Sequence, residues 1–204
     1  MMNRKKVLIQ FEKINELKGD MRLAAEKWST KYQTLISTIL SARSLDETTI
    51  EVCKKMFEKY PDAESFSKLK ERDIRNLIKK INFYKNKSRN ILNCSRILCE
   101  KYNGNPPMNY EKLIELPGVG RKTANVFLSE YGEDTIGVDT HVSYISQYLE
   151  WTKSKKPEII EKDLKRLFPK EYWANLNSVL VKFGKKYRSK NEKNLLLDQL
   201  KTFK

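Results

Sequence analysis

Apolar residues recur at helical spacing along almost the whole chain. Over residues 32–40 they occupy positions i, i+3, i+4, i+7 and i+8, which is the pattern of a helix with one buried face. Similar patterns predict helices over 46–60 (with Asp46 as its N-cap), 73–81, a longer one ending at 103–104, 110–116, 122–131, 140–151, 158–168, 172–183 and 192–203. Residues 135–138 have an extended pattern instead. The chain is therefore expected to be all-α, with about ten helices.

The charge distribution indicates a possible type of binding partner. The 204 residues are 39% hydrophobic, enough for a buried core, and carry 41 basic against 26 acidic side chains, a formal net charge of +15. Two runs are strongly basic: Ile74–Cys99 has no acidic residue, and Lys182–Lys193 has a single one. Both runs would suit a polyanion such as a phosphate backbone, and both would equally suit a solvated, lysine-rich surface.

Composition also excludes several classes of protein. No segment has the ~20 apolar residues that cross a bilayer, and acidic residues interrupt the basic start where a signal peptide would be apolar. We therefore expect an intracellular protein of the cytoplasm or nucleoid, without a membrane partner. The three cysteines form no CxxC or CxxH pair and the chain has one histidine, which argues against disulfides and structural zinc. Cys94 and Cys99 are predicted to be small buried residues.

The segment with the most candidate functional residues is Leu116–Ala124, where Pro-Gly-Val-Gly joins two predicted helices. Gly118 and Gly120 permit backbone conformations closed to other residues and let another backbone come close. The turn also presents N–H groups at a helix N-terminus, where an anion such as a phosphate diester is favoured. Two glycines alone are equally typical of an ordinary αα-hairpin.

Two residues add candidate chemistry. Lys122 stands in the first turn of the second helix, where the helix dipole and Arg121 both disfavour the protonated amine. A fraction of free amine near neutral pH is what a lysine nucleophile requires. Asp139 begins the next predicted helix in the sequence Val-Asp-Thr-His, and a simple helix cap is the alternative to a catalytic role.

The motifs PGVGRKTA and VDTH, at this spacing, resemble the helix-hairpin-helix DNA glycosylase superfamily, most closely its endonuclease III branch. The resemblance runs from about Tyr32 to about Tyr187. It implies the HhH-GPD fold, an all-α fold of two helical lobes with a cleft between them. The first lobe would span 30–135 and hold the hairpin 113–128, and the second would combine 1–29 with 136–204.

The resemblance also implies an activity, base excision with an associated abasic-site lyase step. Lys122 would attack C1′ of the damaged nucleotide, and Asp139 would assist deprotonation and stabilise charge on the sugar. The resulting imine would allow β-elimination. The DNA backbone would be held by the hairpin residues Gly118, Val119, Gly120, Arg121 and Thr123.

The expected partner is double-stranded DNA with a damaged or mismatched base, bound by a monomer. Oxidised pyrimidines are the first expectation for the base removed; mismatched thymine or uracil opposite guanine, and oxidised guanine, are alternatives. A non-enzymatic module that uses the hairpin only to grip phosphates is the alternative from a different class, but such a module has no need for both Lys122 and Asp139.

The sequence departs from the family pattern in three places. Members typically end in a four-cysteine iron–sulfur loop, but residues 183–193 contain no cysteine, so we expect no cluster and no other metal site. A monovalent cation on hairpin carbonyls stays open. Lys185 and Lys186 would contact phosphates in this segment instead. Arg43 stands where members place a glutamine that fills the gap left by the extruded base. Phe83 stands where they insert a wedge, although core packing is equally compatible with a phenylalanine.

Overall fold

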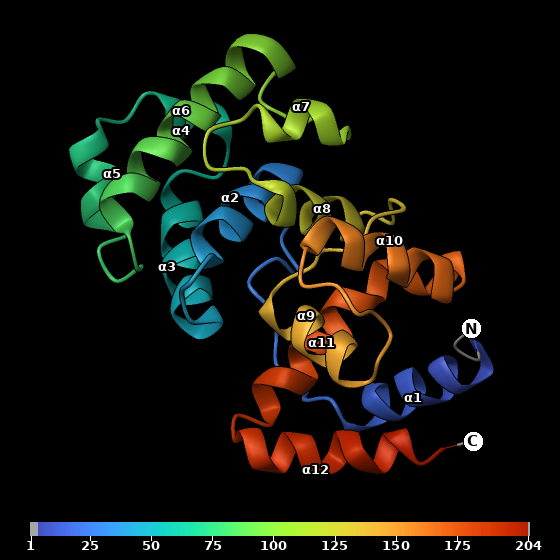
Figure 1. Ribbon diagram of the computed structural model, residues 1–204. Coiled ribbons are helices and arrows are strands. Elements are labelled where there is room, and N and C mark those ends of the chain that lie inside the picture. The colour runs from blue at the N-terminus through green and yellow to red at the C-terminus, as the bar shows by residue number, and fades with distance from the viewer. Residues whose placement is uncertain (1–3, 204) are drawn as a thin grey trace. The chain divides into compact units, whose positions relative to one another are not determined.

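The computed structural model describes residues 4–203, and these form helices and connecting turns without a strand (Figure 1). In chain order the elements are α1 (Arg4–Leu17), α2 (Lys31–Ser41), α3 (Asp46–Lys59), α4 (Ala63–Ser67), α5 (Glu71–Leu77), α6 (Tyr84–Tyr102), α7 (Tyr110–Ile114), α8 (Arg121–Ser129), α9 (Thr140–Tyr148), α10 (Pro157–Leu167), the short 3-10 helix η1 (Lys170–Tyr172), α11 (Trp173–Lys186) and α12 (Lys190–Lys201). The all-α prediction is confirmed. Within residues 4–203 no helix is both long and apolar enough to cross a membrane.

The chain divides into two compact units, each with its own hydrophobic core. The hairpin unit is the continuous segment Arg22–Glu130, and the terminal unit combines the described residues up to Met21 with those from Tyr131 onward. The boundaries predicted from the sequence for these two units were residues 30 and 135.

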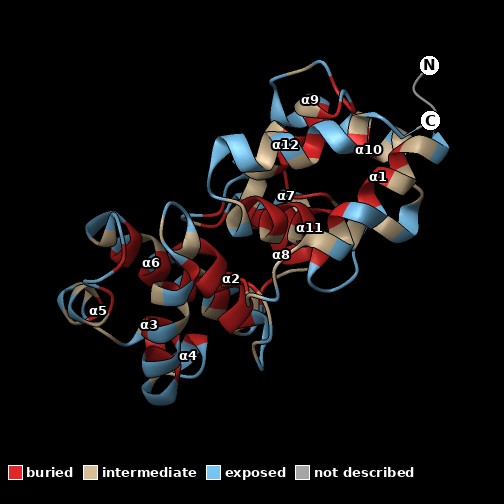
Figure 2. Cartoon of the chain, turned by 90° about the horizontal axis from the view of Figure 1, so that it is seen from below, coloured by how far each residue is buried: buried red, intermediate tan, exposed pale blue. Residues whose placement is uncertain are grey.

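In the hairpin unit, α2 is the central helix. Nearly all of its side chains are buried, and it packs against α3, α6 and α8 (Figure 2). A helix that is apolar or small on all sides is stable only inside a core. Because α8 packs directly on α2, the second helix of the hairpin has a rigid support.

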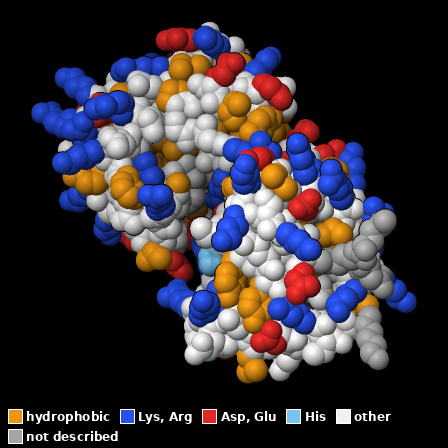
Figure 3. Space-filling model, in the orientation of Figure 1, with side chains coloured by type: hydrophobic (Ala, Val, Ile, Leu, Met, Phe, Trp, Pro, Cys, Tyr) orange, Lys and Arg blue, Asp and Glu red, His pale blue; other side chains and the backbone are white. Residues whose placement is uncertain are grey.

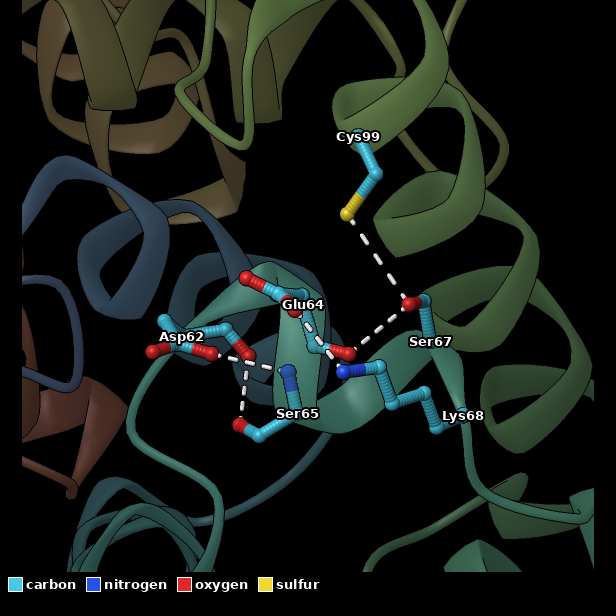
Figure 4. Close-up of polar contacts among 6 residues, drawn as sticks. All are labelled: Asp62, Glu64, Ser65, Ser67, Lys68 and Cys99. Atoms are coloured by element: carbon cyan, nitrogen blue, oxygen red, sulfur yellow. Dashed lines mark hydrogen bonds and ion pairs between the residues drawn. The ribbon is translucent and has the colours of Figure 1, made fainter.

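The short helix α4 is held by caps and by contact with α6. The Asp62 carboxylate accepts a 2.8 Å hydrogen bond from the Ser65 N–H, which lowers the pKa of Asp62, and the Cys99 thiol of α6 lies 3.8 Å from the Ser67 hydroxyl (Figure 4). Phe66 is fully buried in the core. Cys94 is buried as predicted, but Cys99 is partly exposed because it lies at this edge of α6.

In the terminal unit, α1 packs against α11 and α12, and α9 packs against α10 and α11. A buried polar bridge joins three segments: the Gln10 amide donates to the Leu200 carbonyl at 3.0 Å and accepts from the Trp151 indole at 2.7 Å. The nitrogen and the oxygen of this buried side-chain amide therefore both have hydrogen-bond partners, which avoids the cost of an unpaired polar group.

Three local predictions need correction. Helices α1 and α4 fall where none was predicted. Asp46 is the first residue of α3 rather than its N-cap, which is Leu45, and its carboxylate accepts from the Ala24 N–H at 3.3 Å. The basic segment 182–193 is mostly helical, because α11 continues to Lys186 and α12 begins at Lys190, capped by Ser189.

Candidate functional site

The hairpin consists of α7, a tight turn and α8. Asn109 caps α7 by accepting a 2.9 Å hydrogen bond from the Lys112 N–H. The turn is closed by two backbone hydrogen bonds of 3.0 Å, from Leu116 to Leu113 and from Val119 to Leu116. These three side chains are buried in the core of the hairpin unit. The turn is therefore anchored by its apolar side chains, while the backbone around its glycines stays at the surface.

The two glycines of the turn have different roles. Gly118 has φ of +84°, and a Cβ there would lie 3.0 Å from Asn90 Cβ and 3.2 Å from Ile39 Cγ2, so this position requires glycine. Gly120 has φ of −97° and ψ of 177°, a conformation that any residue adopts, and a Cβ there would meet no atom within 4 Å. The expectation of a restricted backbone is therefore wrong for Gly120, whose exposed Cα faces open space.

Gly120 is the N-cap of α8, and among the described residues this helix has no side-chain cap and no acidic residue in its first turn. Caps with a side-chain acceptor are present at the N-termini of α2, α4, α7, α9 and α12. The positive end of the α8 dipole is thus left without an anionic side chain of its own first turn, and it borders the open space beside Gly120.

The side chains at the start of α8 divide between surface and core. Arg121 is exposed and turns toward α7, with its Nη1 3.4 Å from the Tyr110 hydroxyl and its guanidinium 5.7 Å from the ring centre. Lys122, the second residue of α8, is partly buried. Val119 and Thr123 are buried, so a ligand at the hairpin would reach their backbone rather than their side chains.

Asp139 lies in the terminal unit as the N-cap of α9, which confirms its capping role. One carboxylate oxygen, Oδ1, accepts 2.9 Å hydrogen bonds from the N–H groups of both His141 and Val142. Among residues 4–203 no hydrogen bond is made to the other oxygen, Oδ2, and the residue is partly exposed. The segment before it is fixed by Asn177, whose amide donates to the Gly137 carbonyl at 2.6 Å. The cap therefore uses half of the carboxylate.

The start of α9 is also fixed by a close helix contact. A Cβ at Gly184 of α11 would lie 2.2 Å from His141 Nδ1 and 2.8 Å from His141 Cγ. No side chain other than hydrogen fits there, since real Cβ contacts are never so short. The histidine of the VDTH motif thus packs on the bare backbone of α11, two residues from Asp139.

Arg43 and Phe83 lie together in the hairpin unit. The Phe83 side chain is 57% exposed, so the core-packing alternative is wrong. The Arg43 guanidinium lies 5.8 Å from the centre of the Phe83 ring, and the Asn82 amide donates to the Arg43 carbonyl at 2.7 Å. Both residues have left-handed backbones, with φ of 55° and 59°. Neither is a glycine, and such strain concentrates at functional sites.

Two neighbours of Arg43 were not predicted from the sequence. Leu45 is 65% exposed, and no periodicity distinguishes it from a core leucine. Lys87 was counted as part of a basic surface run, but it is buried and donates to three oxygens around Arg43. Its position in the first turn of α6 gave no local signal of burial.

Basic side chains are more numerous than acidic ones on the surface shown in Figure 3. Some of these basic side chains form ion pairs or hydrogen bonds with other residues of the protein. In the run Ile74–Cys99, Arg75 forms an ion pair with Glu71, and Lys80 lies 3.3 Å from Glu51. In the terminal unit, Lys186 donates to the Leu17 carbonyl at 2.9 Å and thereby ties α11 to the end of α1, while Lys185 is partly exposed.

The residues present do not fit a thiolate-bound cluster. All three cysteines of the sequence lie in the hairpin unit, and burial raises the pKa of the Cys53 and Cys94 thiols. Four thiolates hold a cubane cluster. Within residues 4–203 no group of three or more His, Cys, Asp or Glu side chains could hold a metal ion.

Comparison with known structures defines the class of the fold. The chain superposes with TM-score 0.84 on a trapped endonuclease III–DNA covalent intermediate, at 31% sequence identity over 93% of this chain and 89% of that one. A non-covalent endonuclease III–DNA complex gives TM-score 0.85 with the same identity and coverage. A thermostable thymine-DNA glycosylase, at 21% identity and TM-score 0.65, shares the fold alone.

Proteins of similar sequence are also endonuclease III enzymes. Endonuclease III of Thermotoga maritima is 43% identical over 161 residues, 78% of this chain and 76% of the relative. Endonuclease III of Bacillus subtilis is 36% identical over 190 residues, 91% of this chain and 85% of the relative. The family model of the HhH-GPD superfamily of base excision DNA repair proteins matches residues 36–170, which include the hairpin and Asp139. The chain belongs to this superfamily.

Proposed function

We propose that this protein is a base excision repair DNA glycosylase with an associated abasic-site lyase activity, acting as a monomer on duplex DNA inside the cell. The observation that carries the proposal is the pair of motifs within the family-matched segment: an uncapped α8 with Lys122 in its first turn, and Asp139 with one carboxylate oxygen outside its capping bonds. Relatives named endonuclease III, and solved structures of endonuclease III with DNA, support the same activity.

In the proposed reaction, the neutral Lys122 amine attacks C1′ of the damaged nucleotide. The bond from C1′ to the base breaks, and the base leaves with the bonding electron pair and takes up a proton. The attacking amine gives up one proton, and the C1′–O4′ bond then breaks with O4′ taking up a proton, which leaves a protonated imine between Nζ and C1′. Loss of the C2′ proton then expels the 3′ phosphate by β-elimination.

Asp139 has the complementary role. A carboxylate near the sugar stabilises the positive charge that develops at C1′ and accepts a proton from the attacking amine. Oδ1 already holds the first turn of α9, so we assign the chemistry to Oδ2. The N–H groups of the α8 first turn and the open face of Gly120 support a grip on the DNA phosphates.

Arg43 and Phe83 are proposed to replace and unstack bases at the lesion. Both side chains are exposed and lie on adjacent loops of the hairpin unit. An aromatic wedge unstacks a base step, and the arginine fork matches O6 and N7 of guanine. In keeping with the resemblance to endonuclease III, we propose oxidised pyrimidines as the first substrates. Arg43 favours thymine or uracil opposite guanine as the second candidate.

We further propose that the protein works without an iron–sulfur cluster, because its three cysteines cannot supply four thiolates. Purified protein is expected to be colourless. Metal analysis should find no stoichiometric iron, and four irons with four acid-labile sulfides per chain would contradict the proposal.

Borohydride trapping tests the function. Reduction of the imine should give a covalent protein–DNA adduct on abasic or damaged duplexes, and a screen of lesions against each opposite base should identify the substrate. Lys122→Gln should abolish both adduct and excision while duplex binding is kept, because glutamine preserves the helix. Lys112→Gln, at an exposed position on α7, is the matched control and should trap like the wild type. An adduct that persists in Lys122→Gln would place the nucleophile elsewhere.

A further inference from the structure

Lys87 is buried in a way that lysines rarely are. Lys87 is 7% exposed, yet no carboxylate within residues 4–203 pairs with its amine. Nζ instead donates to the Leu40 carbonyl at 2.8 Å, the Ala42 carbonyl at 2.6 Å and the Ser44 hydroxyl at 3.2 Å. Carbonyls at the end of a helix lack partners within it, and the end of α2 is negative, so an ammonium group is well placed there.

The three oxygens bracket Arg43. Ala42 and Ser44 are its two chain neighbours, and the Arg43 carbonyl itself accepts from the Asn82 amide at 2.7 Å. One turn of α6 with the loop before it therefore holds every residue from Ala42 to Ser44. This hold maintains the left-handed backbone of Arg43, which L side chains rarely adopt unless their surroundings require it.

The same lysine is tied to Phe83. The Lys87 N–H donates to the Phe83 carbonyl at 3.0 Å in the first turn of α6, and Phe83 is the left-handed N-cap of that helix. The Lys87 backbone thus contacts one exposed loop, and its side chain contacts the other. The Arg43 guanidinium consequently rests 5.8 Å from the centre of the Phe83 ring.

We propose that Lys87 is a positioning residue: its buried amine fixes the loop that carries Arg43 against the loop that carries Phe83, so that both side chains are held in place to contact DNA. The proposal rests on the function proposed above. It differs from a plain helix cap, because a cap stabilises α2 without affecting the recognition of a lesion. Burial also lowers the pKa of Lys87 to about 8, which agrees with an amine removed from water.

A double-mutant cycle tests this role. Lys87→Met keeps an unbranched side chain of similar volume but removes all three hydrogen bonds. We measure single-turnover excision of the lesion that the wild type excises fastest, and trapping on a pre-formed abasic duplex, for the wild type, Lys87→Met, Arg43→Ala and the double variant. Lys101→Met, an exposed lysine in the last turn of α6, is the matched control and should behave like the wild type.

We expect Lys87→Met to slow excision about fivefold or more, because the loop loses three hydrogen bonds. Trapping on the abasic duplex should change less than about twofold, since an abasic nucleotide is easily extruded. In the Arg43→Ala background, Lys87→Met should add less than about twofold, because residues that act as a unit are not additive. Equal slowing in both backgrounds, or equal loss on the abasic duplex, would reduce Lys87 to a structural cap.

Two further arms keep the test decisive. If circular dichroism shows that Lys87→Met does not fold, Asn82→Ala is used in the same cycle, because the Asn82 side chain is exposed and bonds to the same loop. It should show the same non-additivity with Arg43→Ala, and additivity would overturn the proposal. A wild type that neither excises any lesion nor forms an adduct would overturn the function itself, whereas excision with an additive cycle would overturn the Lys87 role alone.

Discussion

Alanine substitutions at Gly118 and Gly120 should separate the folding of the hairpin from its grip on DNA. The two glycines are two residues apart in one turn, yet their surroundings are opposite. A methyl group at Gly118 would press on Asn90 and Ile39 inside the hairpin unit, and at Gly120 it would point into open space. Gly118→Ala should therefore lower the stability of the hairpin unit, whereas Gly120→Ala should affect only how closely a ligand can approach the turn.

The expected magnitudes follow from this geometry. At Gly118 the left-handed backbone costs an alanine ~1–2 kcal/mol, and the 3.0 Å contact with Asn90 Cβ adds a further cost. Gly118→Ala should thus lose about 2–4 kcal/mol of unfolding free energy. Gly120→Ala loses less than ~1 kcal/mol as an N-cap and regains ~0.4–1 kcal/mol from the stiffer unfolded chain, so its stability should be close to wild type.

Thermal unfolding and fluorescence anisotropy with an undamaged duplex measure both effects. Gly120→Ala should keep its melting temperature and bind the duplex at least about tenfold more weakly, because its methyl group keeps a phosphate from the α8 N–H groups. Gly104→Ala, also at positive φ in the same unit but outside the hairpin, controls for backbone strain and should be destabilised without losing affinity. A folded Gly120→Ala with wild-type affinity would refute the phosphate grip.

Three further predictions address single residues. Asp139→Asn should retain thermal stability within about 0.5 kcal/mol and bind duplex normally but lose most excision, because the amide oxygen can still cap α9 but has no charge; full activity would limit Asp139 to capping. Phe83→Ala should cost less than ~1 kcal/mol of stability, since the ring is exposed, and should weaken binding of a lesion duplex more than cleavage of abasic sites; a loss of 3–5 kcal/mol in thermal unfolding would indicate core packing instead. The pKa of Lys87 is about 8 when folded and lies below its usual value, so the unfolded chain binds more protons between the two values. The unfolding free energy of the wild type relative to Lys87→Met should therefore rise from pH 7.5 to pH 9.5, and a fall would contradict the burial of an ammonium ion.

Sequence predicted best what is encoded locally. The hairpin depends on a proline, two glycines and the apolar side chains that flank them, and the structure has α8 begin at Arg121, one residue before the predicted start at Lys122. The cap of α9 is equally local, because an aspartate before a helix accepts from the N–H groups two and three residues ahead. Such features require no knowledge of distant segments.

Features that depend on distant segments were missed. The burial of Lys87 is created by the end of α2, more than forty residues away in the sequence. Helix α4 has five residues, too few to be stable alone, and persists because Phe66 is buried in a core shared with α6. Phe83 is exposed and has a left-handed backbone, and no periodicity in the sequence encodes either feature.

Asp46 and Asp139 show why a local signal has a limit. Both precede or begin helices, and both were candidates for N-caps, yet Asp46 is already helical and its carboxylate bonds to Ala24, while Asp139 caps α9. The Asp46 carboxylate accepts from an N–H group 22 residues away in the sequence, which a local pattern does not encode. For Asp139 the cap occupies Oδ1 alone. Capping therefore does not exclude the proposed catalytic role of this residue: the cap fixes the carboxylate through Oδ1, and the proposed chemistry requires only Oδ2.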